Sequence, residues 1–269
     1  MLKIATWNVN SVNARLSNVI NWLVNNSIDV LLLQEIKCQN DCFPYEEFEK
    51  YGYKLLVNGQ KSYNGVAIVY NNNCKLKSYS ITYPDNTHDE EARYIEAIYN
   101  TILGDLKIIS IYVPNGTNVG HEKYYRKVQF LENLCIHLKK LSNDFKVLVG
   151  GDFNVAPFDI DVHDSSVCTN HLAFSQLEKE CLRKIINCGY LDCYRTLNPD
   201  IRQYTWWDYR HQGLQKNHGW RIDGILVNPS LVDYLCNSYV DKNERYKDKP
   251  SDHVPVVAEF NSFDNRKYF

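Results

Sequence analysis

The most informative stretch of the sequence, residues 147–154, is a short apolar run that ends in polar groups. Its apolar start and the two glycines after it predict a buried strand. Asp152 and Asn154 share one face if the strand geometry continues, and Gly150 and Gly151 allow backbone or substrate to approach closely. Side chains at strand ends of open α/β folds face a ligand crevice. Taken alone, the stretch also fits an ordinary turn.

Three other predicted strands end in the same way. Asn8 closes the first apolar segment, Glu35 closes the second, and Tyr112 closes a later one. The segment that ends at Glu35 is apolar on both faces, as expected of a central strand. A tyrosine packed at a strand edge is common, so Tyr112 alone indicates little. Four polar strand ends together favour one shared crevice.

Two more polar groups lie next to strands in the C-terminal third. Asp223 opens an apolar segment, and Asp252 and His253 precede the last predicted strand. A carboxylate that bonds an imidazole fixes its tautomer and stabilises the imidazolium. Asp223 and His253 are therefore expected to form an Asp–His pair.

The chemistry of this set is that of oxygen ligands with one imidazole. The set comprises Asn8, Glu35, Tyr112, Asp152, Asn154, Asp223, Asp252 and His253. Converging carboxylates repel one another unless a cation neutralises them, and Mg²⁺ prefers carboxylate oxygens with water and phosphate. The sequence shows no Cys–His cluster for zinc, no serine elbow and no phosphate-binding Gly-Lys-Ser/Thr loop. These features favour attack by water on a phosphodiester with metal assistance.

Composition and periodicity predict the elements that carry these residues. The 269 residues, 44% of them hydrophobic and 23% charged, suit one large α/β domain over 1–269. Strands are expected at 53–57, 66–70, 76–81, 94–99 and 106–112, with helices at 122–141 and around 177–185. Strands that alternate with helices and with meanders predict two sheets with helices outside.

Other features bear on location and on nucleic-acid binding. No apolar run is long enough to span a membrane, and no secretory signal is visible. Nine scattered cysteines without a Cys-x-x-Cys pair suggest reduced thiols in the cytoplasm. A net charge of −2 neither indicates nor excludes DNA binding, because a local basic patch suffices. Lys123, Arg126 and Lys127 are expected on a solvated helix face, with phosphate contact as the alternative, and 85–91 as an acidic loop.

Taken in order, the motifs resemble the exonuclease III branch of the endonuclease/exonuclease/phosphatase superfamily. The matching stretches are 6–10 (TWNVN), 33–35 (LQE), 112–116 (YVPNG), 151–154 (GDFN), 204–209 (YTWWDY), 220–223 (WRID) and 250–253 (PSDH). They cover the chain nearly from end to end. The resemblance implies a four-layered α/β sandwich of the DNase I-like type, with two packed mixed β-sheets flanked by helices.

The resemblance also implies roles for the site residues. Glu35 would hold Mg²⁺, or Mn²⁺ in its place. The wider set of metal ligands or metal neighbours would be Asn8, Asp152, Asn154, Asp252 and His253. Asp152 would activate the attacking water or protonate the leaving oxygen. Asn8, Tyr112 and Asn154 would bind the scissile phosphate, and His253, oriented by Asp223, would stabilise the pentacovalent charge.

The implied activity is DNA repair. Similar proteins cut double-stranded DNA 5′ to an abasic site, and many also remove 3′ nucleotides or 3′ blocking groups. Trp206 and Trp220 resemble the aromatic walls of the abasic-site pocket, which admit a flipped sugar without its base. Each could equally be a core tryptophan. Arg93, Arg210 and Lys216 are candidate contacts to the DNA backbone, although exposed cations are usually only solvated.

Some features depart from the family pattern, and some alternatives stay open. Asn10 stands where some relatives carry an aspartate, and no arginine follows the 114–116 motif as it does in animal relatives. The chain starts close to the first strand, so a bacterial type is the nearer comparison. Open alternatives are a phosphodiesterase for inositol phosphates, sphingomyelin or RNA, and a DNA-binding module without catalysis. A monomer is the default expectation.

Overall fold

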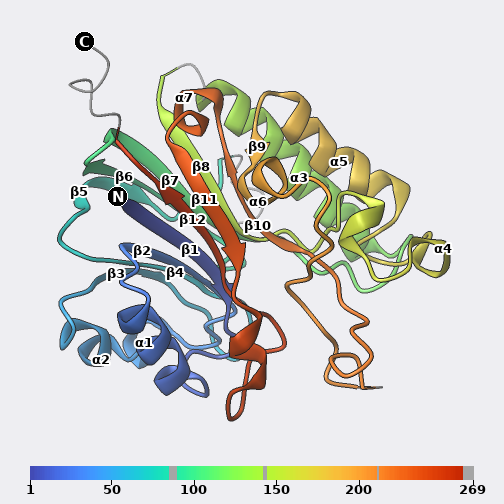
Figure 1. The fold of residues 1–269 in the computed structure, drawn as a ribbon, viewed down its shortest axis with the longest axis horizontal. Helices are drawn as coiled ribbons and strands as arrows, with labels where there is room; N and C mark the ends of the chain where they lie inside the picture. The colour runs from blue at the N-terminus through green and yellow to red at the C-terminus, as the bar shows by residue number, and fades with distance from the viewer. Residues whose placement is uncertain (85–89, 142–143, 211, 263–269) are drawn as a thin grey trace.

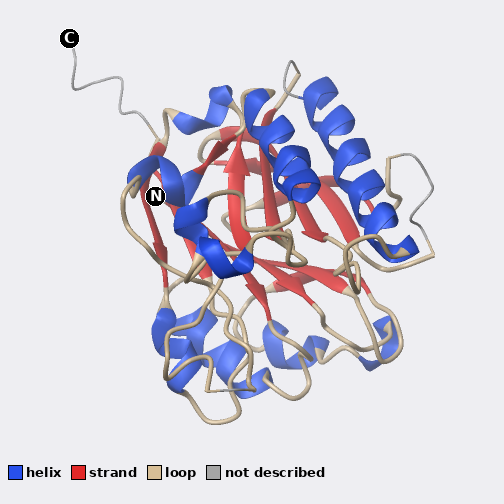
Figure 2. Cartoon of the chain, turned by 90° about the vertical axis from the view of Figure 1, so that its right-hand side faces the viewer, coloured by secondary structure: helices blue, strands red, loops and turns tan. Residues whose placement is uncertain are grey.

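The computed structural model describes residues 1–84, 90–141, 144–210 and 212–262. Of the predicted acidic loop, residues 85–89 lie outside the described part. Two six-stranded sheets form the centre of the molecule. Helices cover the outer face of each sheet, so the chain is layered helix, sheet, sheet, helix (Figure 1). Figure 2 shows the same strands between helices in a view turned by 90°.

The first sheet has the strand order β11-β12-β1-β2-β4-β3. In chain order its strands are β1 (Leu2–Asn8), β2 (Val30–Gln34), β3 (Lys54–Asn58), β4 (Val66–Tyr70), β11 (Leu235–Val240) and β12 (Val256–Phe260). Only β1 and β2 pair in parallel; the other neighbours are antiparallel.

The second sheet repeats this plan with the order β5-β6-β7-β8-β10-β9. Its strands are β5 (Lys75–Ser80), β6 (Tyr94–Thr101), β7 (Gly104–Tyr112), β8 (Lys146–Asp152), β9 (Leu191–Asp192) and β10 (Asp223–Val227). Here β7 and β8 form the parallel pair. Each sheet therefore has one parallel pair at its centre, and both pairs end in residues of the predicted site.

The helices lie over the outer faces and at the ends of the sheets. They are α1 (Leu16–Asn25), α2 (Tyr45–Glu49), α3 (Glu122–Leu141), α4 (Ser165–Cys168), α5 (Gln176–Asn187), α6 (Cys193–Leu197) and α7 (Pro229–Val232), with 3₁₀ turns η1 (Asn40–Cys42), η2 (Asp159–Asp161) and η3 (Lys242–Tyr246). Among the described residues, no helix has the length and apolar character needed to cross a membrane.

Three apolar clusters correspond to the three interfaces between the four layers. One lies between the sheets and includes Ile4, Leu32 and Ile108. A second packs α1 against the first sheet, and a third packs α3 and α5 against the second sheet. Gly150 permits the close approach of the sheets, because a Cβ there would lie 2.7 Å from Leu32 Cδ1. The predicted four-layered sandwich is confirmed.

The sequence located most long elements within one or two residues. The long helix spans Glu122–Leu141 as predicted. The prediction of a solvated cationic face at its start is wrong for one residue: Lys127 is fully buried, whereas Lys123 is exposed. Lys127 is in register with the apolar stripe that includes Tyr124 and Leu131, so helical spacing could have placed it inside. The edge strands β9 and β11 were not predicted.

Candidate active site

Strand direction explains why distant residues meet. Since β1 and β2 are parallel, Asn8 and Glu35 lie at the same edge of the first sheet; β7 and β8 bring Tyr112 and Asp152 to one edge of the second. Antiparallel strands begin where parallel strands end. Asp223 at the start of β10 is accordingly paired in register with Asp152.

Direct hydrogen bonds join the strand ends of the first sheet to those of the second. Asn8 Nδ2 donates to Glu35 Oε1 at 2.8 Å and to Asp152 Oδ2 at 2.9 Å, so one amide links the sheets. Asn8 Oδ1 accepts from the backbone N–H of Asn10. Asn8 therefore turns its nitrogen toward both carboxylates, and it is itself fully buried beneath them.

Asp152 accepts several hydrogen bonds and lies close to His253. Its Oδ1 accepts from the Asn154 backbone N–H at 2.8 Å, and its Oδ2 lies 3.8 Å from His253 Nε2. Burial, and after it repulsion from Asp223, raises the pKa of Asp152 to about 7. A carboxyl with a pKa near neutrality can exchange a proton with water during turnover.

His253 and Asp223 form the expected pair. His253 Nδ1 lies 2.9 Å from Asp223 Oδ2, and both side chains are buried. Burial by itself lowers the pKa of His253, but the charge of Asp223, followed by that of Asp152, raises it to about 10. The ring is therefore held as an imidazolium at neutral pH. Ser251 supports it by accepting from the His253 backbone N–H and donating to the Asn8 carbonyl.

Glu35, from the first sheet, pairs with Lys37, which the sequence analysis did not predict as a site residue. Lys37 Nζ lies 2.8 Å from Glu35 Oε2 and 2.5 Å from Asn10 Oδ1. Burial raises the pKa of Glu35, but hydrogen bonds from Asn8 and Lys37 outweigh it and lower the pKa below the usual value. The only signal for Lys37 was its position two residues after Glu35, which could have placed both side chains together.

Tyr112 and Arg93 stack at the end of β7. The Arg93 guanidinium carbon lies 4.6 Å from the centre of the Tyr112 ring, and Arg93 also pairs with Glu91 at 2.7 Å. The expectation that Arg93 is an exposed cation is wrong, since only 8% of it is exposed. Burial, followed by the charges of Glu35 and Asp152, raises the pKa of Tyr112 well above its usual value. The phenol therefore remains a hydrogen-bond donor.

Asp252 links the polar centre to the aromatic wall. Its Oδ1 accepts from Asn10 Nδ2 at 2.9 Å, and its Oδ2 accepts from Trp206 Nε1 at 3.0 Å. Trp206 also pairs through its backbone with both Trp220 and His253. Burial raises the pKa of Asp252, but the charge of His253 and these two hydrogen bonds lower it overall.

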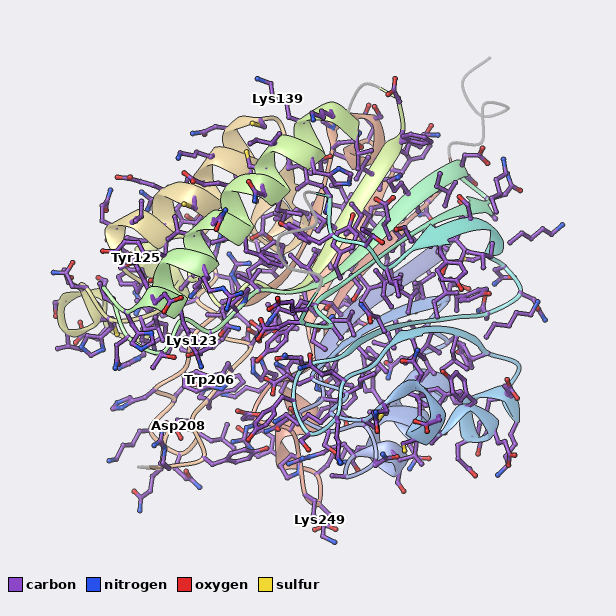
Figure 3. The ribbon with its side chains drawn as sticks, turned by 180° about the vertical axis from the view of Figure 1, so that it is seen from behind. Lys123, Tyr125, Lys139, Trp206, Asp208 and Lys249 are labelled. Carbon is purple, nitrogen blue, oxygen red and sulfur yellow. The ribbon has the colours of Figure 1, made fainter. Side chains whose placement is uncertain are left out.

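A cavity of about 930 Å³ opens over this group. Of the predicted site residues, those that line it are Glu35, Tyr112, Asp152, Asn154, Trp206, Arg210, Trp220, Asp252 and His253. Asn8, Arg93 and Asp223 do not line it; each is buried behind a residue that does. Arg210 is exposed at the rim and pairs with Asp208 at 2.8 Å. Figure 3 shows Trp206 and Asp208 at the same end of the molecule as Lys123.

Among the described residues, one cluster of acidic and imidazole groups could hold a metal ion. Single ligand atoms of Glu35, Asp152 and His253 all lie within 4.8 Å of one another. Asp252 is not part of that cluster. Its position is set instead by Asn10 and Trp206, as described above.

The fold and this cluster define a class of hydrolases that act on phosphate esters. The chain matches the Endonuclease/Exonuclease/phosphatase family over residues 5–253. It belongs to that family, and the predicted resemblance is confirmed.

Individual relatives are similar over nearly their whole length. Exodeoxyribonuclease III of Haemophilus influenzae is 32% identical, with 96% of this chain and all of that protein covered. An AP endonuclease from Archaeoglobus fulgidus is 38% identical with a TM-score of 0.91, covering 97% of this chain and 100% of that one. A 3′ phosphatase from Neisseria, bound to a product DNA hairpin, is 35% identical with a TM-score of 0.92 and the same coverage.

Proposed function

We propose that this protein is a Mg²⁺-dependent DNA repair nuclease that hydrolyses the phosphodiester 5′ to abasic sites in double-stranded DNA. We include 3′–5′ exonuclease and 3′-end-cleaning activity, because the same ester chemistry occurs at a 3′ end. One observation carries the proposal: carboxylates and an imidazole from both sheets open into a cavity walled by Trp206 and Trp220. The similarity to exonuclease III and to an AP endonuclease supports it.

The residues fit a divalent cation. Glu35 and Asp152 supply hard oxygen donors, and burial beside other acids makes the ionised form of Asp152 unfavourable. A cation would offset that repulsion. Glu35 and Asp152 would hold it, with Asp252, Asn154, Asn8 and His253 as the remaining predicted ligands or neighbours. When bound, it supplies positive charge that neutralises the phosphate and the charge developing in the transition state.

Different side chains of the protein carry out the proton transfer and the stabilisation of charge. In our proposal the water oxygen attacks phosphorus, the bond from phosphorus to the 3′ oxygen breaks, and that oxygen leaves as a hydroxyl. Asp152 either takes the proton from water or gives one to the leaving oxygen. His253, kept cationic by Asp223, stabilises the charge on the phosphoryl oxygens, and Tyr112 and Asn154 donate hydrogen bonds to them.

The aromatic wall supplies selectivity in this proposal. Trp220 packs edge-on against Phe174, with ring centres 6.2 Å apart, so its ring is supported from behind. Trp206 is held by Asp252. A sugar without a base would fit between supported rings, whereas an intact nucleotide would have to displace them.

Contacts outside the cavity complete the proposal. Arg210 at the rim of the cavity and Lys216 in the neighbouring hollow, which shares His163 and His218 with the cavity, are exposed and would contact the DNA backbone. Arg93 would act through Tyr112, because the tyrosine ring covers it. We further propose a single-domain monomer that works in the cytoplasm, which is supported by nine cysteines that form no disulfide.

The test is incision of a duplex with a tetrahydrofuran abasic analogue. With Mg²⁺ we expect a single cut 5′ to the lesion and a 3′-hydroxyl product; EDTA should abolish it. An undamaged duplex and a duplex with a 3′-phosphate end measure exonuclease and phosphatase activity in parallel. Intact abasic substrate at high enzyme concentration would refute the proposal.

A further inference from the structure

A fully buried ion pair lies behind the candidate site and plays no part in the chemistry described so far. Lys127 Nζ on α3 is 2.5 Å from Glu178 Oε1 on α5, and neither side chain has any exposed surface. The two helices lie side by side over the same sheet (Figure 1). Removing two charges from water costs free energy, and apolar residues of similar size often stabilise a fold equally well. Stability alone therefore does not explain why this position holds an ion pair.

The lysine end of the pair holds the loop that follows β8. Lys127 Nζ donates to the carbonyl of Asn154 at 2.7 Å and to the carbonyl of Asn115 at 3.2 Å. Asn154 has a φ of 51°, in the left-handed region that a residue with a side chain adopts only at an energetic cost. The buried ammonium therefore fixes the backbone of a residue whose N–H and side-chain amide both donate to Asp152.

The glutamate end holds the opposite wall of the cavity. Glu178 Oε1 also accepts from the Ala173 backbone N–H at 3.0 Å, and Oε2 accepts from the N–H and hydroxyl of Ser175. Ala173 lines the cavity with a φ of 68°. The Ala173 carbonyl in turn accepts from the N–H of Ala156. One ion pair thus fixes the loops after β7 and β8 and the loop before α5.

We propose that Lys127 and Glu178 are positioning residues, which set the placement of Asn154 and Ala173 needed in the transition state. Neither side chain lines the cavity, so neither touches the substrate. The inference deepens the proposed nuclease function and rests on it for its kinetic test. A second α3–α5 pair, Lys184 with Glu132 at 3.0 Å, is about half exposed and serves as the matched control.

The first measurement compares Lys127→Met with Lys184→Met on the abasic duplex. We expect kcat of Lys127→Met to fall about 10- to 100-fold, because a shift of about 1 Å in a positioned group has an effect of that size. KM should stay within about threefold, since the DNA contacts remain. Lys184→Met should match the wild type. A kcat of Lys127→Met equal to the wild type would overturn the inference.

The second measurement separates positioning from folding. Lys127→Met leaves Glu178 as a buried unpaired charge, so its melting temperature should drop. The double variant Lys127→Met/Glu178→Gln removes that charge but does not restore the donor to Asn154. We expect the melting temperature to recover while kcat stays low. Recovery of both would show a structural role only and would overturn the inference.

Backbone amide shifts make the result independent of activity. In ¹⁵N spectra of the double variant, the amide signals of Asn154 and Ala173 should move, while those of the equivalent Lys184→Met sample should not. If the wild type fails to incise abasic DNA, the proposed function fails, yet these shifts still test the positioning. Unmoved Asn154 and Ala173 signals would overturn the inference whatever the activity.

Discussion

At the residue scale, the candidate site places side by side two groups whose pKa values are shifted by the same neighbour. Asp152 and His253 lie 3.8 Å apart, and both are buried. Asp223 raises the pKa of both groups, of Asp152 by repulsion and of His253 by attraction. A carboxyl ready to exchange a proton therefore stands next to an imidazole that keeps its proton, as separate acid-base and charge-stabilising roles require.

The first prediction concerns His253 on the alkaline side. Because its pKa is raised from 6.5 to about 10, the cation persists at neutral pH and is lost as pH rises toward 10. We expect wild-type kcat to decline over that range. His253→Gln should be slower by about 10²-fold and should lack this decline. A pH–rate profile of both proteins decides; an unchanged alkaline limb in the variant would exclude the imidazolium role.

The second prediction concerns metal affinity. With a pKa of about 7, Asp152 carries a proton at pH 6 that a cation must displace. Apparent Mg²⁺ affinity should therefore weaken by about tenfold per pH unit below 7 and level off above it. Calorimetric titration between pH 5.5 and 8.5 measures this. In Asp152→Asn the dependence should disappear along with most activity; a pH-independent affinity in the wild type would contradict the prediction.

At the element scale, strand direction determines which side chains lie at the site, and buried charge networks hold the strands in place. Arg221, two residues before Asp223, pairs with Asp161 at 2.7 Å and with Asp192 at 2.6 Å. These partners come from η2 and from β9, so the network fixes the start of β10. The short WRID motif thus carries a wall residue, a structural cation and the partner of His253.

The third prediction tests that network. Arg221→Met would leave Asp192 without its cation and Asp161 with Arg195 as its remaining partner, at 2.6 Å. We expect the free energy of unfolding to fall by about 3–5 kcal/mol. Lys77→Ala breaks an exposed pair with Asp105 and should leave the free energy of unfolding nearly unchanged, because solvent screens the pair. Urea unfolding followed by tryptophan fluorescence measures both. Equal effects of the two substitutions would argue against a structural role for the network.

At the scale of the whole molecule, a net charge of −2 must coexist with a DNA-binding face. Arg210 is exposed at the rim of the cavity, Lys216 is exposed in a neighbouring hollow that shares His163 and His218 with the cavity, and Lys123 is exposed at the start of α3. Figure 3 places Lys123 at the same end as Trp206 and Asp208, while Lys139 lies toward the other end of α3. A local positive rim can bind phosphates although acidic groups elsewhere balance the total.

The fourth prediction concerns salt. If the rim contacts phosphates, affinity for an abasic duplex should fall steeply and linearly on a log–log plot between 50 and 200 mM KCl. Arg210→Ala should reduce the slope by about one. Lys139→Ala, an exposed cation away from the cavity, should leave it unchanged. Fluorescence anisotropy with Asp152→Asn, which we expect to have lost most activity, limits turnover during the measurement. A flat response would indicate a small-molecule substrate.

The sequence by itself determined the kind of chemistry. Apolar strands that stop at Asn8, Glu35, Tyr112 and Asp152 show where burial ends, and four polar groups at such points together favour one shared crevice. The order of the motifs indicated the family, and the family implied two sheets. The strand ends are local information, because a strand and the residue that ends it are neighbours in the chain, and the motif order needs only the sequence as a whole.

Only the tertiary structure decided which cations take part and how each acid titrates. Arg93 and Lys127 were expected to be exposed cations but are buried, and Lys37, which was not among the predicted site residues, pairs with Glu35. The pKa of Asp152 depends on Asp223, which is far away in sequence but opposite it in the sheet. The physical reason is that burial and charge–charge interaction depend on distances in space, which the chain's order does not contain until the sheets pack.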